Sequence, residues 1–455
     1  MDTGEAPVQR IRPRRPVGVG ASIAALSTLA AALFGGLSTL VVARILGASG
    51  TGEYSVVLAT LAGLIVLADL GLDTSALYHV AGRRWTEAHA VRQLQLAAAV
   101  FGVIGVGIGL AAGVLFQDSL FHGISLGTLT LGLVALPFAL SWTYGSTVAF
   151  ATDAYEWGSV PWVIQGVVGL ALVEVLTRFY GVTGAVAGIT LSHVIVAVLV
   201  GVRGFRRTRG EVDRWLAGTF SSLRMAVGFG YKANLTKVMA VVNQRADLLI
   251  LNAYAAHAVV GQYGVALALT ALQVLVPSSL SRAVVPRISS LGGADSPDER
   301  AELTRKSVKH GILISILTGI AMTVALLAVP IVFGSDFEPS VRLGWILIPG
   351  TTAYGIAYAF SAVIVGRGHP GHILHATAIV TPLTLLLYLL LIPSFGATGA
   401  AVASTLSYTG TFALYWFYFR RVSGISDVSA LLPGREEIDD YRMLLGRLPT
   451  RPRMP

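Results

Sequence analysis

The sequence predicts an all-α integral membrane protein with about twelve transmembrane helices in two six-helix bundles around a central cavity. Hydrophobic residues make up 54% of the chain and charged residues only 13%, whereas a soluble domain carries about 25% charged residues. Apolar stretches of roughly 20 residues, the length that spans a bilayer as a helix, recur along the chain. These stretches do not alternate polar and apolar residues, as the strands of a transmembrane barrel do.

The apolar stretches define the expected helices and the segments between them. The first stretch begins at Val17 and is longer than the ~7–15 apolar residues of a signal peptide, so we expect an uncleaved first helix. The expected helices are 18–43, 54–80, 94–116, 124–149, 158–179, 182–202, 224–252, 256–281, 310–333, 343–366, 372–393 and 397–419. The expected regions are an N-terminal arm (1–17), a first bundle (18–203), a linker (204–223), a second bundle (224–419) and a polar tail (420–455).

The positions of lysine and arginine predict the orientation of the chain. If both termini are cytoplasmic, 27 of the 33 Lys and Arg residues lie on the cytoplasmic side, in agreement with the positive-inside rule. Arg44, Arg178 and Arg342 lie on the outer side, and the remaining three lie within the expected helix 224–252. We therefore interpret the net charge of +9 as a topology signal, and we expect no nucleic-acid partner.

Several kinds of chemistry are disfavoured by the sequence. There is no cysteine, which excludes a thiolate nucleophile and a cysteine-based metal site. His369, His372 and His375 have a spacing that could suggest a metal, but no carboxylate accompanies them. The expected loops are too short for a soluble catalytic domain. We therefore expect no catalytic residue, no metal and no cofactor.

An internal repeat relates the two halves of the chain. GEYSVVLA at 52–59 matches GQYGVALA at 261–268, and GVTGAVAGITLS at 181–192 matches GATGAAVASTLS at 396–407. Pro137 and Pro349 form a third pair at nearly the same offset. The repeat places the first six helices over the last six in the same orientation. Such parallel bundles can rock about a central cavity and expose it to each side of the membrane in turn.

The segments that carry the repeat also carry a family resemblance. ARILGASGTGEYSVVLATLAGLIVLADLGL at 43–72 resembles the first hairpin of bacterial polysaccharide (O-antigen-type) flippases, of the multidrug/oligosaccharidyl-lipid/polysaccharide exporter superfamily. NQRADLLILNAYAAHAVVGQYGVALAL at 243–269 is similar to the family's helix 7–8 hairpin. The second half of the family is resembled, in order, by VPRISSL at 285–291, IVFGSDFEPSVRLGWILIP at 331–349, GRGHPG at 366–371 and LIPSFGATGAAVASTLS at 391–407.

The resemblance implies a flippase in cell-surface polysaccharide biosynthesis in the bacterial plasma (inner) membrane. Its substrate would be a polyprenyl-pyrophosphate-linked oligosaccharide, moved between leaflets by alternating access. Membrane lipids, an H⁺ or Na⁺ coupling ion and other polysaccharide-assembly membrane proteins are the further candidate partners. One alternative is a cation-coupled multidrug exporter of the same superfamily, which predicts an acidic cavity. Another is a membrane-embedded polysaccharide polymerase or glycosyltransferase, which the short outer loops disfavour.

The expected helix 224–252 is unusually polar for bilayer depth, where each charge costs at least ~2.5–3.5 kcal/mol. At about 100° per residue its polar side chains form two stripes, so we expect it to line a water-filled cavity. An arginine there can bind two phosphate oxygens at once. The alternative is that these residues reach the membrane surface or pair in structural salt bridges. The candidate pyrophosphate and sugar ligands are Lys237, Arg245, Lys232, Arg44, Asn234 and Gln244.

Carboxylates and aromatic rings supply the remaining candidates. Asp69 and Asp73 lie four residues apart and share one helix face. They are expected to bind a coupling proton or Na⁺, to pair with the lysines of 224–252, or to form a cap or hinge. Asp247 and Glu174 are further ion-coupling candidates. Four aromatic residues of repeat-equivalent helices can either stack on sugar or simply pack: Trp142, Tyr144, Tyr354 and Tyr358.

Overall fold

The computed structural model describes residues 17–208, 219–290, 297–425, 427 and 431–434. Helices and the turns between them make up this part of the chain. The expected N-terminal arm except Val17, the middle of the linker and most of the tail lie outside the described residues.

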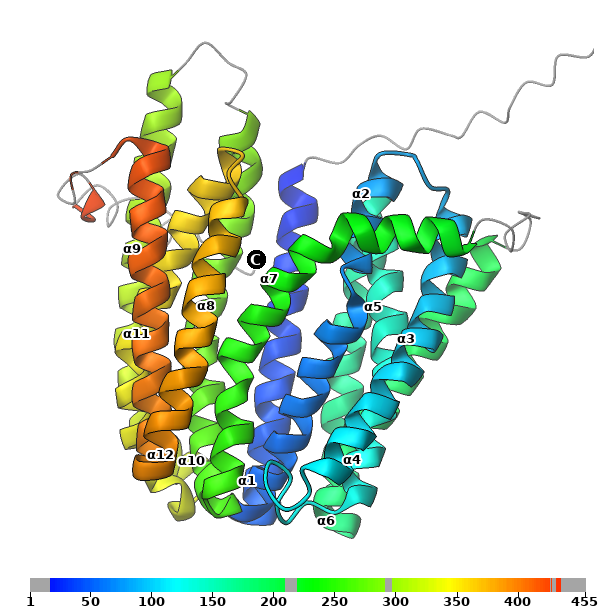
Figure 1. The fold of residues 1–455 in the computed structure, drawn as a ribbon, viewed down its shortest axis with the longest axis vertical. Coiled ribbons are helices and arrows are strands. Elements are labelled where there is room, and N and C mark those ends of the chain that lie inside the picture. Colours follow the sequence, from blue (N-terminus) through cyan, green and yellow to red (C-terminus); the bar gives the residue numbers. More distant parts are fainter. Residues whose placement is uncertain (1–16, 209–218, 291–296, 426, 428–430, 435–455) are drawn as a thin grey trace, which may run out of the picture.

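Two groups of helices form the molecule, and they meet along α1 of the first group and α7 of the second (Figure 1). The first group contains α1 (Val17–Asp69), α2 (Leu72–Ala81), α3 (Glu87–Leu115), α4 (Leu126–Leu133), α5 (Ala135–Ala151) and α6 (Tyr155–Thr208). The second contains α7 (Thr219–Tyr254), α8 (His257–Ser290), α9 (Pro297–Ala325), α10 (Val329–Phe333), α11 (Glu338–Gly366) and α12 (Gly371–Ser423). Below, the inner end of each bundle is the end at which α6 finishes and α7 begins.

Three of the helices are long because each joins two expected spans at a glycine. The backbone leaves the helical conformation at Gly47 (φ 66°), Gly181 (φ 58°) and Gly396 (φ 54°), a region that glycine adopts readily because it has no Cβ. Eight helices of the described chain are long and apolar enough to cross a membrane, and these three are among them. Counting each as two spans and adding the more polar α7 accounts for the expected twelve.

The structure corrects several of the expected helix boundaries. The helix expected at 310–333 already begins at Pro297, as α9, and the helix expected at 256–281 continues to Ser290, as α8. The second span begins directly after Gly47 rather than at residue 54, because the chain reverses at this one glycine. That span is then broken at Leu70 and Gly71, which both have positive φ. The expected helix 124–149 divides at Val134 into α4 and α5.

The internal repeat is confirmed by backbone geometry. Gly181 and Gly396 occupy equivalent repeat positions and have almost the same conformation, with ψ of −138° and −133°. Three residues later, a Cβ at Gly184 would collide with the carbonyl of Leu176, and one at Gly399 would collide with the carbonyl of Leu391. Each small-residue motif therefore closes the same tight helix pair in its own bundle.

The two bundles touch at two glycine crossings. Gly52 and Gly261, which occupy equivalent positions in the first matched pair of segments, pack α1 against α8 so closely that either Cβ would collide with the opposite backbone. Toward the inner end, Gly71 packs against Gly230 of α7 in the same way. These crossings fix where the bundles approach each other.

Apolar side chains cover the outward faces of the helices. Ile108 of α3 is 58% exposed, Ile320 of α9 is 60% exposed and Leu390 of α12 is 59% exposed. A protein surrounded by water rarely exposes apolar patches of this extent. The surface is therefore suited to lipid, and the chain is a multi-pass membrane protein.

Candidate functional site

Helix α7 connects the two bundles through polar and aromatic contacts. Its first turns lie across the ends of α2 and α3 (Figure 1), where Gln93 of α3 donates to the Ser222 hydroxyl at 2.7 Å. Phe229 stacks on Tyr78 of α2 with ring centroids 4.6 Å apart. Its later turns pack against α12, where the Tyr388 hydroxyl donates to the Asn243 carbonyl at 3.0 Å. Any movement of one bundle relative to the other would therefore change the contacts of α7.

Lys237 forms an ion pair between the bundles. Its ammonium lies 2.5 Å from the Asp73 carboxylate and 3.6 Å from the Asp69 carboxylate. The Lys237 side chain is 37% exposed, against 28% for Asp73 and 10% for Asp69. The carboxylates thus come from the first bundle and the ammonium from α7, as one of the three sequence-based alternatives expected.

Asp69 also caps the broken turn between α1 and α2. Its carboxylate accepts from the backbone N–H groups of Gly71 and Asp73, each at 3.2 Å. The positive φ values at Leu70 and Gly71 interrupt the helical hydrogen bonds there, and a side-chain carboxylate supplies the missing acceptor. Asp69 therefore combines the cap and the lysine partner that sequence analysis treated as alternatives.

Asp247, further along α7, is fully buried, and its side-chain partners belong to the second bundle. Its carboxylate accepts from the Tyr263 hydroxyl at 2.6 Å and from the Leu248 N–H at 2.8 Å. Ser404 of α12 donates to the same carboxylate at 3.3 Å. The described side chains around Asp247 supply hydroxyl donors rather than an Arg245 salt bridge.

Arg245 and Gln244 line a cavity of about 220 Å³ in the second bundle. Three aromatic residues face it, and Tyr354 stacks on Tyr408 with ring centroids 5.0 Å apart. The Gln244 amide donates to the Tyr354 hydroxyl at 3.3 Å, and Tyr358 packs edge-on to Tyr354 at 5.2 Å. The cavity therefore combines a guanidinium, an amide and aromatic rings, which suits an anionic carbohydrate.

The other predicted ligands are dispersed. Arg44 donates from Nε to the Val332 carbonyl and from a terminal nitrogen to the Ile331 carbonyl, both at 2.5 Å. It therefore holds α1 to the C-terminal end of α10, where backbone carbonyls are exposed. Lys232 lies 5.8 Å from the Tyr231 ring centroid. Asn234 is 6% exposed, and its side-chain oxygen has no hydrogen-bond partner among the described residues.

Glu174 and the first-bundle aromatics also lie elsewhere. Glu174 pairs with Arg178 at 2.8 Å on an exposed face of α6. The Trp142 indole donates to His193 at 2.9 Å, and Tyr144 is fully buried with its hydroxyl 3.4 Å from the Asp69 carbonyl. Trp142 and Tyr144 are packed in the first bundle, whereas Tyr354 and Tyr358 reach the cavity.

Sequence reasoning missed Tyr408 at the cavity and the hydroxyl donors around Asp247. Tyr408 directly follows the small-residue motif that revealed the repeat, and Ser404 lies within that motif. Tyr388, whose hydroxyl lies 3.0 Å from that of Ser404, is the one polar residue in the run LLLYLLL at 385–391. A hydroxyl inside a long apolar run was the available signal, because such a group needs a partner at bilayer depth.

The fold defines a class of multi-pass membrane protein built from two repeated helix bundles. The chain belongs to the family described as polysaccharide biosynthesis proteins, whose model matches residues 17–292. The model of the MatE family matches residues 235–390. Both matches agree with the resemblance seen in the sequence.

Known proteins show the same likeness. A probable low-salt glycan biosynthesis flippase, Agl15 of Haloferax volcanii, is 26% identical over 173 residues, which are 38% of this chain and 37% of that protein. An inward-facing multidrug resistance MATE family transporter superimposes with a TM-score of 0.71 at 14% identity, covering 90% of this chain and 99% of that one. The lipid II flippase MurJ gives 0.66 at 13% identity, covering 94% and 93%. The structural matches confirm the expected fold.

Proposed function

We propose that this protein is a flippase that moves a polyprenyl-pyrophosphate-linked oligosaccharide across the membrane by alternating access. The observation that carries the proposal is the cavity beside α7, where Arg245 and Gln244 lie with three tyrosines. A pyrophosphate needs fixed positive charge within the bilayer, where an unpaired charge is costly. Arg245 supplies that charge, and the tyrosine rings supply flat surfaces for sugar.

Release of Lys237 from its aspartate partners is the proposed conformational step. In this structure the ammonium of Lys237 is held by Asp73 and Asp69, next to the close crossing of Gly71 and Gly230. A proton or Na⁺ that binds these carboxylates would weaken their hold on Lys237 and make its charge available to a pyrophosphate. The ion gradient would thereby be coupled to separation of the bundles at this crossing.

Asp247 is a second candidate for ion coupling on the same helix. It is fully buried, and its carboxylate faces hydroxyl groups of α8 and α12. Oxygen ligands of this kind suit a hard cation. In the described conformation Arg44 contacts α10 and Lys232 lies over the Tyr231 ring. We therefore assign the proposed substrate contacts of Arg44, Lys232 and Asn234 to other stages of the transport cycle.

The proposed location is a bacterial plasma membrane with both termini in the cytoplasm. The charge distribution of the sequence supports this orientation. The inner end of the bundles then faces the cytoplasm, where lipid-linked sugars would enter. Membrane lipids and other polysaccharide-assembly proteins are the proposed neighbours.

A deletion strain tests this function and identifies the sugar. Deleting the gene should cause one lipid-linked oligosaccharide to accumulate in the inner leaflet, measured by mass spectrometry of extracted lipids and by its inaccessibility to sugar-modifying reagents outside the cell. The wild-type gene should reverse the accumulation, and a gene encoding Arg245→Gln should not. Unchanged lipid-linked sugars together with greater sensitivity to cationic drugs would favour the drug-exporter alternative instead.

A further inference from the structure

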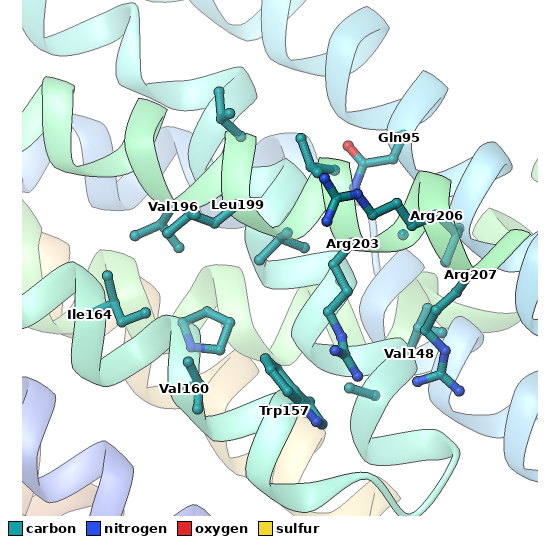
Figure 2. A pocket seen from close by; sticks show the side chains of 18 of the residues that line it. Gln95, Val148, Trp157, Val160, Ile164, Val196, Leu199, Arg203, Arg206 and Arg207 are labelled. Carbon is teal, nitrogen blue, oxygen red and sulfur yellow. The ribbon is translucent and has the colours of Figure 1, made fainter. Parts of the chain in front are cut away.

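A second cavity lies in the first bundle, away from Lys237 and Arg245. It has a volume of about 490 Å³, within the ~300–1,000 Å³ range of small-molecule sites. Its walls come from the first turns of α3, the last turns of α5 and both ends of α6. These segments meet at the inner end of the bundle, and we call this cavity the inner pocket (Figure 2).

One wall of the inner pocket is apolar and open to the side of the bundle. Val160, Ile164, Val196 and Leu199 form this wall (Figure 2). Val160 is 37% exposed and Leu199 is 51% exposed. Because the outward faces of these helices contact lipid, the wall is accessible to an acyl chain from the membrane.

The other wall is basic. Figure 2 shows Arg203, Arg206 and Arg207 gathered at one side of the inner pocket. The Arg203 guanidinium lies over the Trp157 ring, 3.5 Å from its centroid. Arg207 donates to the Glu87 carboxylate at 3.0 Å. Arginines thus outnumber carboxylates among the residues that line the inner pocket.

We propose that the inner pocket binds one phosphate-bearing lipid, namely an anionic phospholipid of the inner leaflet. Its phosphate would contact Arg203 and Arg206, and one acyl chain would lie along Val160 and Leu199. Arginine binds phosphate through two parallel hydrogen bonds, and the aromatic contact holds Arg203 in place. Basic pockets between transmembrane helices at the cytoplasmic side typically receive anionic lipid head groups.

The same chemistry could come from two sources, a bulk phospholipid or the polyprenyl-pyrophosphate substrate. The inner pocket lies on the first bundle, whereas the proposed substrate cavity lies beside α7 in the second. Binding at the inner pocket therefore does not depend on the proposed flippase activity. The test measures lipid binding rather than transport, so failure of one proposal leaves the other intact.

Binding can be measured on the purified full-length protein by native mass spectrometry and by the melting temperature. The lipids are phosphatidylglycerol, phosphatidylcholine and a polyprenyl pyrophosphate, each added to detergent micelles. Arg203→Gln with Arg206→Gln removes charge, and Ala149→Phe reduces the volume of the inner pocket without changing charge. The matched control is Arg420→Gln with Arg421→Gln, at the end of α12, where both arginines also lie over aromatic rings.

Phosphatidylglycerol should bind the wild-type and control proteins and raise their melting temperatures, and phosphatidylcholine should not. The Arg203/Arg206 variant should bind phosphatidylglycerol about tenfold more weakly or worse, and Ala149→Phe should also weaken binding. Equal binding by all variants, or equal loss in the control pair, would overturn the proposal. Binding of the polyprenyl pyrophosphate alone, lost in the same two variants, would contradict the bulk phospholipid and assign the inner pocket to the substrate lipid.

Discussion

Asp69 and Asp73 hold Lys237 through contacts that a change of charge would remove. We predict that Asp69→Asn with Asp73→Asn uncouples transport from the ion gradient, because the pair can no longer exchange a cation for Lys237. Gradient-driven flipping should be lost while the amount of protein in the membrane is unchanged, as measured by a vesicle assay beside quantitative immunoblotting. Glu174→Gln is the control, because this carboxylate pairs with Arg178 on an exposed face. Normal gradient-driven transport by the double variant would remove both aspartates from the mechanism.

Arg245 is expected to act on substrate affinity. Arg245→Gln should raise the apparent KM for the lipid-linked sugar roughly tenfold to a hundredfold, because a charge-assisted contact contributes about 1.5–3 kcal/mol. Arg245→Lys should retain part of the affinity, since it keeps the charge but loses the planar fork. An unchanged KM for Arg245→Gln, measured over a series of substrate concentrations, would show that Arg245 does not bind the substrate.

The sequence predicted that α7 is polar, but it did not predict the partner of each polar side chain. Lys237, Asp69 and Asp73 were all candidates in the sequence, and a lysine–aspartate pair was one expectation. The choice between pairing, capping and ion binding depended on the break at Gly71, which brings the carboxylates to α7. Arg245 and Tyr354 were also named, whereas their convergence in one cavity required the packing of α7 against the second bundle.

At the scale of helices, the glycine kinks are the features that connect adjacent spans. Gly396→Ala should lower stability by ~1–3 kcal/mol, because only glycine readily adopts its backbone conformation, and Gly181→Ala should do the same in the other repeat. Thermal unfolding in detergent micelles measures the loss of stability in each variant. Gly410→Ala in the same helix is the control, since a Cβ there meets open space and alanine favours the helix. Equal melting temperatures for Gly396→Ala and Gly410→Ala would contradict the structural role of the kink.

The helices themselves were largely predictable, whereas their joints were not. Apolar length located the spans, and the GVTGAVAG and GATGAAVA motifs located equivalent helix pairs. The chain contains 51 glycines, so composition alone does not reveal that Gly47, Gly181 and Gly396 are the ones that reverse or kink the chain. That choice depends on tertiary packing, such as the contact of Gly184 with the Leu176 carbonyl.

For the whole molecule, the charge distribution predicts a single orientation. A cysteine introduced at position 212 into this cysteine-free chain should resist an impermeant thiol reagent in intact cells and react once the membrane is opened. A cysteine at position 118, in the predicted outer loop between α3 and α4, should react in intact cells. Labelling of position 212 in intact cells would reverse the orientation and place the inner pocket in the outer leaflet.

The arrangement of two bundles followed from the sequence because the repeat constrains the architecture before any contact is known. The path of α7 did not follow, because it depends on contacts with residues far away in the chain. Gly230 meets Gly71, and Asn243 receives a hydrogen bond from Tyr388. Such pairings between distant residues carry no local sequence signal.

Transport by the purified protein in vesicles measures the proposed flippase activity itself. Vesicles with a defined ion gradient, loaded with a polyprenyl-pyrophosphate-linked oligosaccharide, would report flipping as the appearance of sugar accessible to an added lectin. The wild-type protein should flip the lipid, Lys237→Arg should retain much of the rate, and Lys237→Gln with Arg245→Gln should fall to the rate of protein-free vesicles. Wild-type rates for the Lys237→Gln, Arg245→Gln protein would contradict the account and leave α7 as a structural helix between the bundles.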